Sequence, residues 1–228
     1  MNSRFTTKMG QQLFEIAECV EGGAYDDGNI DRLIVQLLGC AVSCGHTKAM
    51  EMLAAYCLEG WGMRSPNRVK AGRLLESAAH SRDFSSHVDL AFCCYYGYGV
   101  QKDRRKAFLL YRKAVERGIV RGMYNVGLFY DAGEFGVVKQ NLRTAFQWYQ
   151  KAASLGDPDA MFKIAYAYDM GRGVLKDKRT AVQWYRRAAK KGSHDAMWNL
   201  AIFYEKGDVV RKNVPYAQRL KDASKRKT

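Results

Sequence analysis

The sequence has few of the features that mark disordered, exported or membrane-spanning chains. Only 3 of its 228 residues are proline, and 47% are apolar and 26% charged, a composition typical of folded globular proteins. It contains no apolar run of about 18 residues, the length needed to span a membrane. Residues 1–20 also lack the apolar core of roughly 7–15 residues that a signal peptide requires. We therefore expect a folded cytoplasmic protein of one or two domains with no membrane span.

Cysteine is absent from the second half of the chain. The 6 cysteines lie at positions 19, 40, 44, 57, 93 and 94, and no two of them form a Cys-x-x-Cys pair. Cys40 and Cys44 are spaced to share one helical face, with His46 nearby, but a zinc site needs three or four ligands of suitable spacing. We therefore expect buried free thiols, with neither a metal site nor disulfides.

Basic residues outnumber acidic ones by more than two to one in the second half. Residues 1–100 hold 9 Lys and Arg against 11 Asp and Glu, a net −2, whereas residues 101–228 hold 28 against 12, a net +16. This asymmetry favours an anionic partner, which could be nucleic acid, a lipid surface or an acidic protein. It is equally compatible with a basic face that is simply well solvated.

Two sequence blocks alternate along the chain. One has the pattern Ala-x-x-(Trp/Leu)-Tyr-x-(Lys/Arg)-Ala-(Ala/Val)-x-x-Gly and occurs at 107–118, 145–156 and 181–192. The other, (Ala/Gly)-Met-x-x-(Val/Ile/Leu)-(Gly/Ala)-x-x-Tyr-x-x-Gly, follows after three residues each time, at 122–133, 160–171 and 196–207. Both blocks space apolar and small residues along one face of a helix and end at a glycine suited to follow a helix. Each repeat therefore predicts a helical hairpin.

Weaker copies of the same blocks extend the pattern toward both ends. They lie at 8–21, 34–45, 49–60, 71–82, 86–97 and 215–225. We expect a degenerate repeat or cap over residues 1–45 and five repeats over residues 46–228, which include a basic C-terminal tail. Degenerate ends are expected because terminal repeats cap a solenoid with a polar outer face.

The connectors between blocks have the chemistry of turns. Residues 97–103 read GYGVQKD and residues 171–177 read GRGVLKD. The glycines suit the chain reversal, and Asp103 and Asp177 stand where an N-cap of the next helix is expected. A phosphate-binding loop would need Gly-x-x-x-x-Gly-Lys-(Ser/Thr) after a strand, and this pattern does not occur.

The combined pattern, A-x-x-x-L-G-x-x-Y-x-x-G-x-G-V-x-K-D-x-x-x-A-x-x-W-Y-x-K-A-A-x-x-G, resembles the Sel-1-like repeat family, relatives of the tetratricopeptide repeats, over roughly residues 46–225. The resemblance implies an all-α fold, an α/α solenoid in which antiparallel helix pairs wind into a right-handed superhelix. It also implies that the first helices of the repeats, which include 122–133, 160–171 and 196–207, line a concave groove. Such proteins are scaffolds for protein or peptide binding in complex assembly, regulation, virulence and toxin–immunity interactions.

Three connectors depart from the family pattern. Repeat one has GWGMRSPN in place of Val-x-Lys-Asp, repeat three carries two extra residues in GEFGVVKQN at 133–141, and repeat five reads GDVV without its second glycine. These loops are where we expect specificity that is peculiar to this chain.

Motifs of catalysis are missing. The histidines at 46, 80, 87 and 194 have no recurring partner, and neither His-Glu-x-x-His nor Gly-x-Ser-x-Gly occurs. A cysteine-rich branch of the family is linked to β-lactam hydrolysis, but its mark is a disulfide in every repeat, and cysteine is absent from the later repeats here. We therefore expect a non-enzymatic protein with no catalytic residues and no cofactor.

The exposed positions of the first helices are the predicted partner-binding site. In register they are Tyr124, Leu128 and Asp131; Phe162, Tyr166 and Asp169; and Trp198, Ile202 and Glu205, with Asp159 and Asp195 at the helix starts. They form a ladder of aromatic and aliphatic side chains edged by carboxylates, and aromatic anchors of this kind dominate interface energetics when they become desolvated. The alternative is that these aromatics pack in the core.

A basic surface on the second helices offers a different binding mode. It comprises Arg104, Arg105, Lys178, Arg179, Arg186, Arg187, Lys190 and Lys191. A nucleic-acid site needs a continuous Lys and Arg track, preferably with exposed stacking aromatics, and here the cations and the ladder fall on opposite sides. The preferred expectation is thus a scaffold that binds a protein or peptide, acidic ones included, in the concave groove. The alternative is a module that binds nucleic acid or an anionic surface through this basic back.

Overall fold

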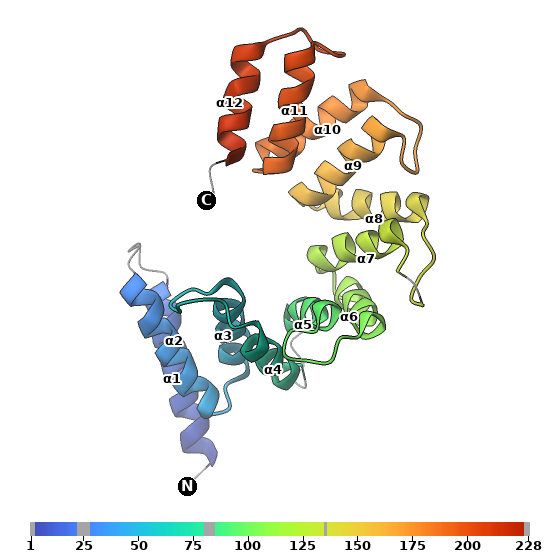
Figure 1. The fold of residues 1–228 in the computed structure, drawn as a ribbon. Helices are drawn as coiled ribbons and strands as arrows, with labels where there is room; N and C mark the ends of the chain where they lie inside the picture. The colour runs from blue at the N-terminus through green and yellow to red at the C-terminus, as the bar shows by residue number, and fades with distance from the viewer. Residues whose placement is uncertain (1–2, 22–27, 80–84, 135, 226–228) are drawn as a thin grey trace. The chain divides into compact units, whose positions relative to one another are not determined.

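The computed structural model describes residues 3–21, 28–79, 85–134 and 136–225. Within these ranges every regular element is an α-helix. The chain divides into two compact units, Met1–Ala114 and Val115–Thr228 (Figure 1). The all-α prediction is confirmed, whereas the predicted division at residue 45 stays a prediction.

The first unit is built from helical hairpins. Its helices are α1 (Ser3–Glu21), α2 (Gly28–Ser43), α3 (Thr47–Glu59), α4 (Arg68–Ala78), α5 (Ser85–Tyr96) and α6 (Arg104–Glu116). The helices α1, α2, α3 and α4 each pack against the next helix along the chain. The pair α1 and α2 corresponds to the degenerate blocks predicted at 8–21 and 34–45.

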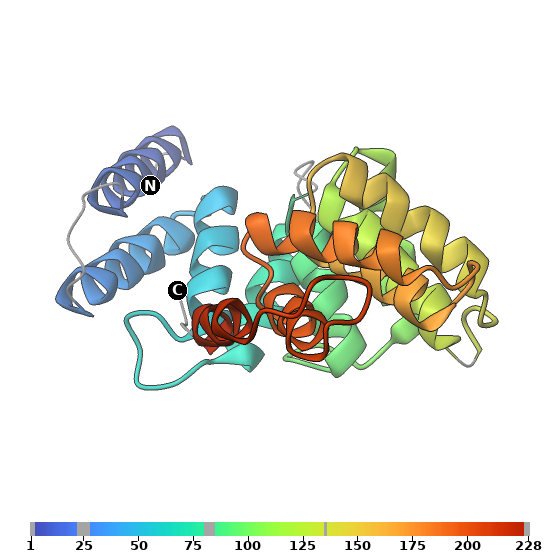
Figure 2. The same ribbon diagram turned by 90° about the horizontal axis from the view of Figure 1, so that it is seen from above.

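The second unit continues the same arrangement. Its helices are α7 (Val120–Ala132), α8 (Leu142–Ser154), α9 (Pro158–Met170), α10 (Lys178–Lys190), α11 (His194–Lys206) and α12 (Val214–Lys225). Each packs against its successor, so the hairpins α7–α8, α9–α10 and α11–α12 stack in series. Figure 2 looks nearly along α11 and α12, which lie side by side. The first helix of each repeat is α7, α9 or α11, and the second is α8, α10 or α12.

Helix boundaries follow the capping residues that the sequence predicts. The first helices end at Gly133, Gly171 and Gly207, each with a positive φ and a backbone N–H that donates to the carbonyl four residues earlier. The Asp103 carboxylate accepts from the backbone N–H of Lys106 at 2.8 Å. Asp177 accepts from the N–H groups of Arg179 and Thr180 in the same way. Both N-cap predictions are therefore confirmed.

The core of the second unit consists of small residues packed around a few large ones. Alanines at the helix contacts are fully buried, and they include Ala160, Ala165, Ala181 and Ala188. Tyr185 is the largest fully buried side chain of the protein's described residues. Methyl side chains let helix axes approach closely, so the aromatic rings fill the space that remains between hairpins.

The cysteine prediction is only partly correct. All six cysteines are free thiols, and Cys57, Cys93 and Cys94 are buried, but Cys19 and Cys40 are exposed. Burial was the wrong expectation for these two because they lie outside the core-facing sides of α1 and α2, whose buried hydrophobic residues are Phe14, Ala17, Ile34, Leu38 and Ala41. Among the described helices, none combines the length and the apolar character that crossing a bilayer demands. His80 and residues 226–228 of the basic tail lie outside the described residues.

Candidate protein-binding face

Three first helices of the second unit, α7, α9 and α11, carry the predicted ladder at matching positions. We call this set the first-helix face: Tyr124, Leu128 and Asp131; Phe162, Tyr166 and Asp169; and Trp198, Ile202 and Glu205. None of the nine is fully buried. Tyr166 and Trp198 are the most open of its aromatics, with 38% and 43% of their surface exposed. The side chains that also pack against the core are Tyr124, Leu128 and Phe162. For these three, the surface position and the alternative of core packing each hold in part.

The aromatic rings of this face are joined to the core by ring contacts. The ring of Phe162 stacks on Tyr166, with centroids 6.4 Å apart, and its other neighbour is the buried Tyr185 at 6.0 Å. Tyr124 lies 5.9 Å from the buried Tyr149. Buried neighbours therefore restrain Phe162 and Tyr124, and Phe162 in turn supports the exposed ring of Tyr166.

Trp198 is held by a residue that the sequence analysis did not single out. Lys221 of α12 places its ammonium 5.3 Å from the centroid of the Trp198 ring. The same ammonium donates to Glu205 Oε1 at 2.5 Å. Glu205 is therefore occupied by an internal ion pair, and part of the indole surface is already covered by a cation.

The predicted carboxylate edge is largely engaged within the protein. Arg172 donates to Asp131 Oδ1 at 2.8 Å, and the Tyr149 hydroxyl donates to Asp131 Oδ2 at 3.3 Å. Asp169 differs, because no ion pair joins it to another described residue. Burial raises the pKa of Asp169, against the opposing effect of Lys178 and Lys176. Asp169 and Ile202 line a cavity of about 330 Å³ between α9 and α11.

Carboxylates gather at the other end of the face, where α9 and α11 begin. Burial raises the pKa of the Asp159 carboxyl, and the carboxylates of Asp157 and Asp195 raise it further. Burial likewise raises the pKa of Tyr124, and the same three carboxylates add to that shift. Lys163 opposes the shift of Asp159, so three carboxylates and one lysine lie at this end of the first-helix face.

The predicted basic surface draws its residues from two helices. Arg104 and Arg105 lie on α6, whereas Lys178, Arg179, Arg186, Arg187 and Lys190 lie on α10 with Lys191 directly after it. All are exposed except Lys178, which is half-buried and forms an ion pair with Asp208. Six of the eight predicted cations therefore lie on α10 or directly after it.

Cations also lie over aromatic rings of the second helices. Arg187 lies over the ring of Trp184 at 4.7 Å, and Lys151 lies over Trp148 at 4.3 Å. Both tryptophans belong to second helices and are outside the ladder that the sequence analysis considered. Since a cation already covers each indole, these rings are poorly placed to stack on bases.

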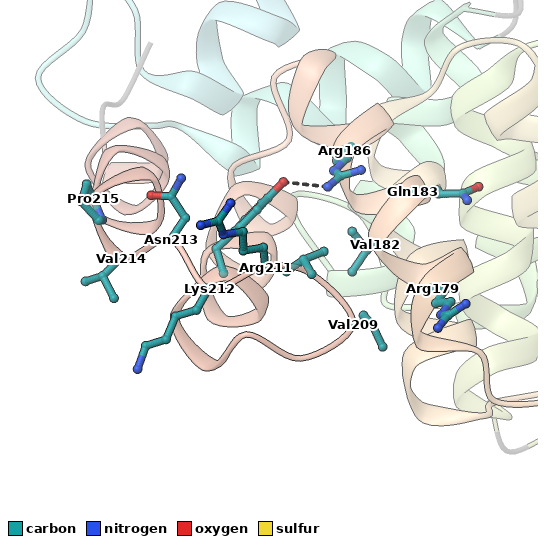
Figure 3. Close-up of a pocket in the computed structure, with 12 residues that line it drawn as sticks. Arg179, Val182, Gln183, Arg186, Val209, Arg211, Lys212, Asn213, Val214 and Pro215 are labelled. Carbon is teal, nitrogen blue, oxygen red and sulfur yellow. Dashed lines mark hydrogen bonds between the residues drawn. The ribbon is translucent and has the colours of Figure 1, made fainter.

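A groove between the last two repeats was not predicted as such, although Arg179, Arg186 and the connector of repeat five were each singled out in the sequence. It lies between α10 and the connector from α11 to α12, and has a volume of about 1080 Å³ (Figure 3). We call it the basic groove, since Arg179, Arg186, Arg211 and Lys212 line it together with Val182 and Val209. The signal in that connector is its missing second glycine.

Potential metal ligands are not clustered in the described part of the chain. There, no group of three or more His, Cys, Asp or Glu side chains is arranged to hold a metal ion. His46 serves as the N-cap of α3, and its ring is stacked 4.5 Å from that of Phe14.

Stacked helical hairpins with an exposed aromatic face define a helical-repeat solenoid of the kind that binds other proteins. The Sel1 repeat model matches residues 47–83, 85–119, 120–157, 158–193 and 194–220. The chain therefore belongs to the Sel1 repeat family, whose fold is typical of protein–protein interaction modules and is generally non-catalytic. The resemblance inferred from the sequence is confirmed.

Solved structures agree with this assignment. A Sel1 repeat protein from Oxalobacter formigenes is similar over 99% of this chain and 86% of its own, with 28% identity and a TM-score of 0.79. The immunity protein PA5088 from Pseudomonas aeruginosa is similar over 95% of this chain and 80% of its own, with 21% identity and a TM-score of 0.61. Pa5087, an immunity protein of the same organism, covers 78% of this chain and 64% of its own, with 24% identity and a TM-score of 0.58. The last two likenesses show the fold alone. None of the curated proteins compared with the chain matches it.

Proposed function

We propose that the chain is a non-enzymatic scaffold or adaptor that binds a segment of another protein on the first-helix face. The observation that carries this proposal is the exposure of Tyr166 and Trp198, at 38% and 43%, on helices whose opposite sides form the core. The free energy of binding becomes more favourable when a partner removes exposed aromatic rings from water, and Trp and Tyr are the usual anchors of interfaces.

The face is also ordered before a partner arrives. Phe162 supports the ring of Tyr166 from below, and Lys221 restrains the ring of Trp198. Side chains that are already fixed lose less conformational entropy on binding, so more of the contact energy is retained as affinity.

Charge favours a partner segment that combines apolar and basic residues. Asp157, Asp159 and Asp195 bring three carboxylates to one end of the face. Asp131 and Glu205 are internally paired and are less available to a cation of the partner. A lysine or arginine of the partner would therefore bind best near the starts of α9 and α11, with apolar side chains against Tyr166 and Trp198.

A dedicated regulatory or immunity partner is one form of this proposal. Two of the similar solved structures are titled immunity proteins, a role in which a solenoid would bind one specific protein. The likeness to them extends to the fold, so the identity of the partner must come from experiment.

The test is a nuclease-treated pull-down from lysate of the source organism at low and high salt, analysed by mass spectrometry. Wild type is compared with a Tyr166→Ala/Trp198→Ala variant, and with Lys190→Glu/Lys191→Glu as the matched control at the end of α10. We expect a protein that survives high salt, is lost from the aromatic variant and is retained by the control. Recovery of nucleic acid or ribosomal proteins alone, lost at high salt and in the control variant, would refute the proposal and favour the basic alternative.

A further inference from the structure

The basic groove brings four cationic side chains together with no acidic residue in its lining. Arg179 and Arg186 come from α10, and Arg211 and Lys212 from the connector that precedes α12. Among the described residues that line the groove, none is Asp or Glu. Figure 3 shows these side chains distributed along the groove, with Val182 and Val209 between the two ends.

Three of the four cations form no ion pair within the described residues. No ion pair links Arg179, Arg211 or Lys212 to any other residue that the structure describes, and all three are exposed. The nearby carboxylate of Asp177 is used as the N-cap of α10. Arg186 is fixed differently, since its guanidinium donates to the Tyr204 hydroxyl at 2.7 Å. The groove thus holds an unbalanced positive charge with one guanidinium already oriented.

The connector that forms one wall is strained at Val209. Its φ of 53° lies in the left-handed region, and it is the one non-glycine residue of the described chain with a positive φ. Gly62, Gly99 and Gly173 have φ values of 65°, 69° and 75° at the matching position of earlier repeats. A β-branched residue is strongly disfavoured there. Strain that the fold does not require is a reason to look for a function of the side chain that causes it.

The side chain of Val209 faces the groove instead of the core. It is 43% exposed, and opposite it the buried Val182 forms part of the floor. In the preceding connector a Cβ on Gly173 would lie 2.5 Å from the Leu142 carbonyl oxygen, so that connector packs directly on the backbone at the start of α8. Valine cannot approach the start of a helix as closely, and its side chain instead offers the groove an apolar contact.

We propose that the basic groove binds an acidic segment of a partner protein, an extended stretch in which carboxylates are separated by apolar side chains. The carboxylates pair with Arg179, Arg211 and Lys212 and with the oriented guanidinium of Arg186. The apolar side chains contact Val182 and Val209. Arginine suits this role because its planar guanidinium binds a carboxylate through two parallel hydrogen bonds.

The lining favours a peptide over nucleic acid. Val210, Val214 and Pro215 add further apolar surface beside the cations. Tyr204 is the sole aromatic of the lining, and its ring packs edge-on against Tyr216 with centroids 4.8 Å apart while Arg186 binds its hydroxyl. A single-stranded nucleic acid would need open ring faces for its bases. The volume of about 1080 Å³ is also larger than one phosphate group requires.

This site is separate from the first-helix face. Its cations lie on α10 and on the last connector, whereas the first-helix face lies on α7, α9 and α11. The two surfaces also have opposite charge, so they select different partner segments. Loss of either binding activity leaves the other testable.

The experiment uses the full chain and a fluorescein-labelled peptide in which glutamate alternates with leucine, followed by fluorescence anisotropy. The groove variant is Arg211→Glu/Lys212→Glu. The control is Lys190→Glu/Lys191→Glu, which changes the net charge equally at exposed residues outside the groove. A third variant, Val209→Gly, removes the apolar contact and the strain together. Where charge reversal disturbs the fold, judged by circular dichroism, Arg211→Gln/Lys212→Gln replaces it.

We expect the groove variant to weaken binding by about tenfold or more, and the control by less than about threefold. The peptide with glutamine in place of glutamate should bind as weakly as the groove variant does. Val209→Gly should weaken binding by about threefold while raising the urea midpoint of unfolding, a combination that a purely structural role of Val209 would not produce. The proposal is overturned if wild type does not bind the peptide, if the control loses as much affinity as the groove variant, or if oligodeoxythymidine displaces the probe more readily than unlabelled peptide does.

Discussion

Arg172, in the connector after α9, donates to Asp131 Oδ1 at the end of α7, with 2.8 Å between the nitrogen and the oxygen. This hydrogen bond links one repeat to the repeat before it. Asp131 also accepts the hydroxyl of Tyr149, which is buried in the core. One carboxylate therefore satisfies a half-exposed guanidinium and a buried phenol at the same time. The two partners should matter to different degrees.

Replacing Asp131 should cost more stability than replacing Arg172. Asp131→Ala leaves the buried Tyr149 hydroxyl without its acceptor, which should lower the free energy of unfolding by about 1–2 kcal/mol. Arg172→Ala removes a partly exposed ion pair and should cost about 0.5 kcal/mol. Urea unfolding of both variants checks the order, and Asp131→Asn, which keeps an acceptor oxygen, should fall between them. An Arg172→Ala variant less stable than Asp131→Ala would contradict this account.

Gly127 on α7 allows a close contact between helices. A Cβ at this position would lie 2.6 Å from Cε1 of the Tyr149 ring. Gly127→Ala should therefore destabilise the protein by about 1–3 kcal/mol through overpacking. Gly39→Ala on α2 is the matched control, because a Cβ there meets no atom within 4 Å. In the control, helix propensity alone acts and should raise stability by about 0.5–1 kcal/mol. Thermal unfolding that shows the same sign for both substitutions would refute the packing argument.

The hairpins could be predicted from the sequence because their determinants are local. Apolar spacing, the closing glycines and the N-caps Asp103 and Asp177 each act within a few residues, so the period of the repeat exposes them. The site depends on contacts between residues far apart in the chain. Lys221 reaches Trp198 from α12, and Arg172 reaches Asp131 across 41 positions. No periodicity indicates such pairs.

The repeat pattern also could not predict which residues of the ladder are exposed. Phe162 and Tyr166 are four residues apart on α9 and look equivalent in sequence, yet Phe162 packs against the core and Tyr166 is open. What distinguishes them is the buried ring of Tyr185, which comes from α10 and meets Phe162. The basic groove depends in turn on the backbone conformation of Val209. The missing glycine indicated that this connector is unusual, but the sequence did not predict where the connector lies relative to α10.

The free thiols should separate into fast and slow classes. Cys19 and Cys40 are exposed and should react readily with iodoacetamide under native conditions. Burial raises the pKa of Cys93 to about 12, and it also raises the pKa of Cys57 and of Cys94. Because the thiolate is the reactive form, these three should be modified only after unfolding. Peptide mapping by mass spectrometry distinguishes the classes, and rapid native labelling of Cys93 would show that the first unit opens at this site.

Because of His46, the free energy of unfolding should decrease as the pH falls below about 6.5. In the folded protein Nδ1 of His46 accepts the backbone N–H of Ala49, and Nε2 is 2.8 Å from Gln11 Oε1, an arrangement that requires the neutral ring. Burial and Lys48 lower the pKa of His46 in the folded state, against the opposing effect of Glu18 and Glu15. In the unfolded chain the pKa of His46 is near 6.5, so the unfolded state binds the proton more readily than the folded state. The free energy of unfolding therefore decreases as the pH falls from about 6.5 toward the lower pKa of the folded state. Below that pKa it no longer changes through His46. His46→Asn keeps an N-cap acceptor and should abolish this part of the pH dependence, whereas His194→Asn should leave it in place. Urea unfolding at a series of pH values measures both, and an unchanged pH profile in His46→Asn would rule out this histidine as the origin.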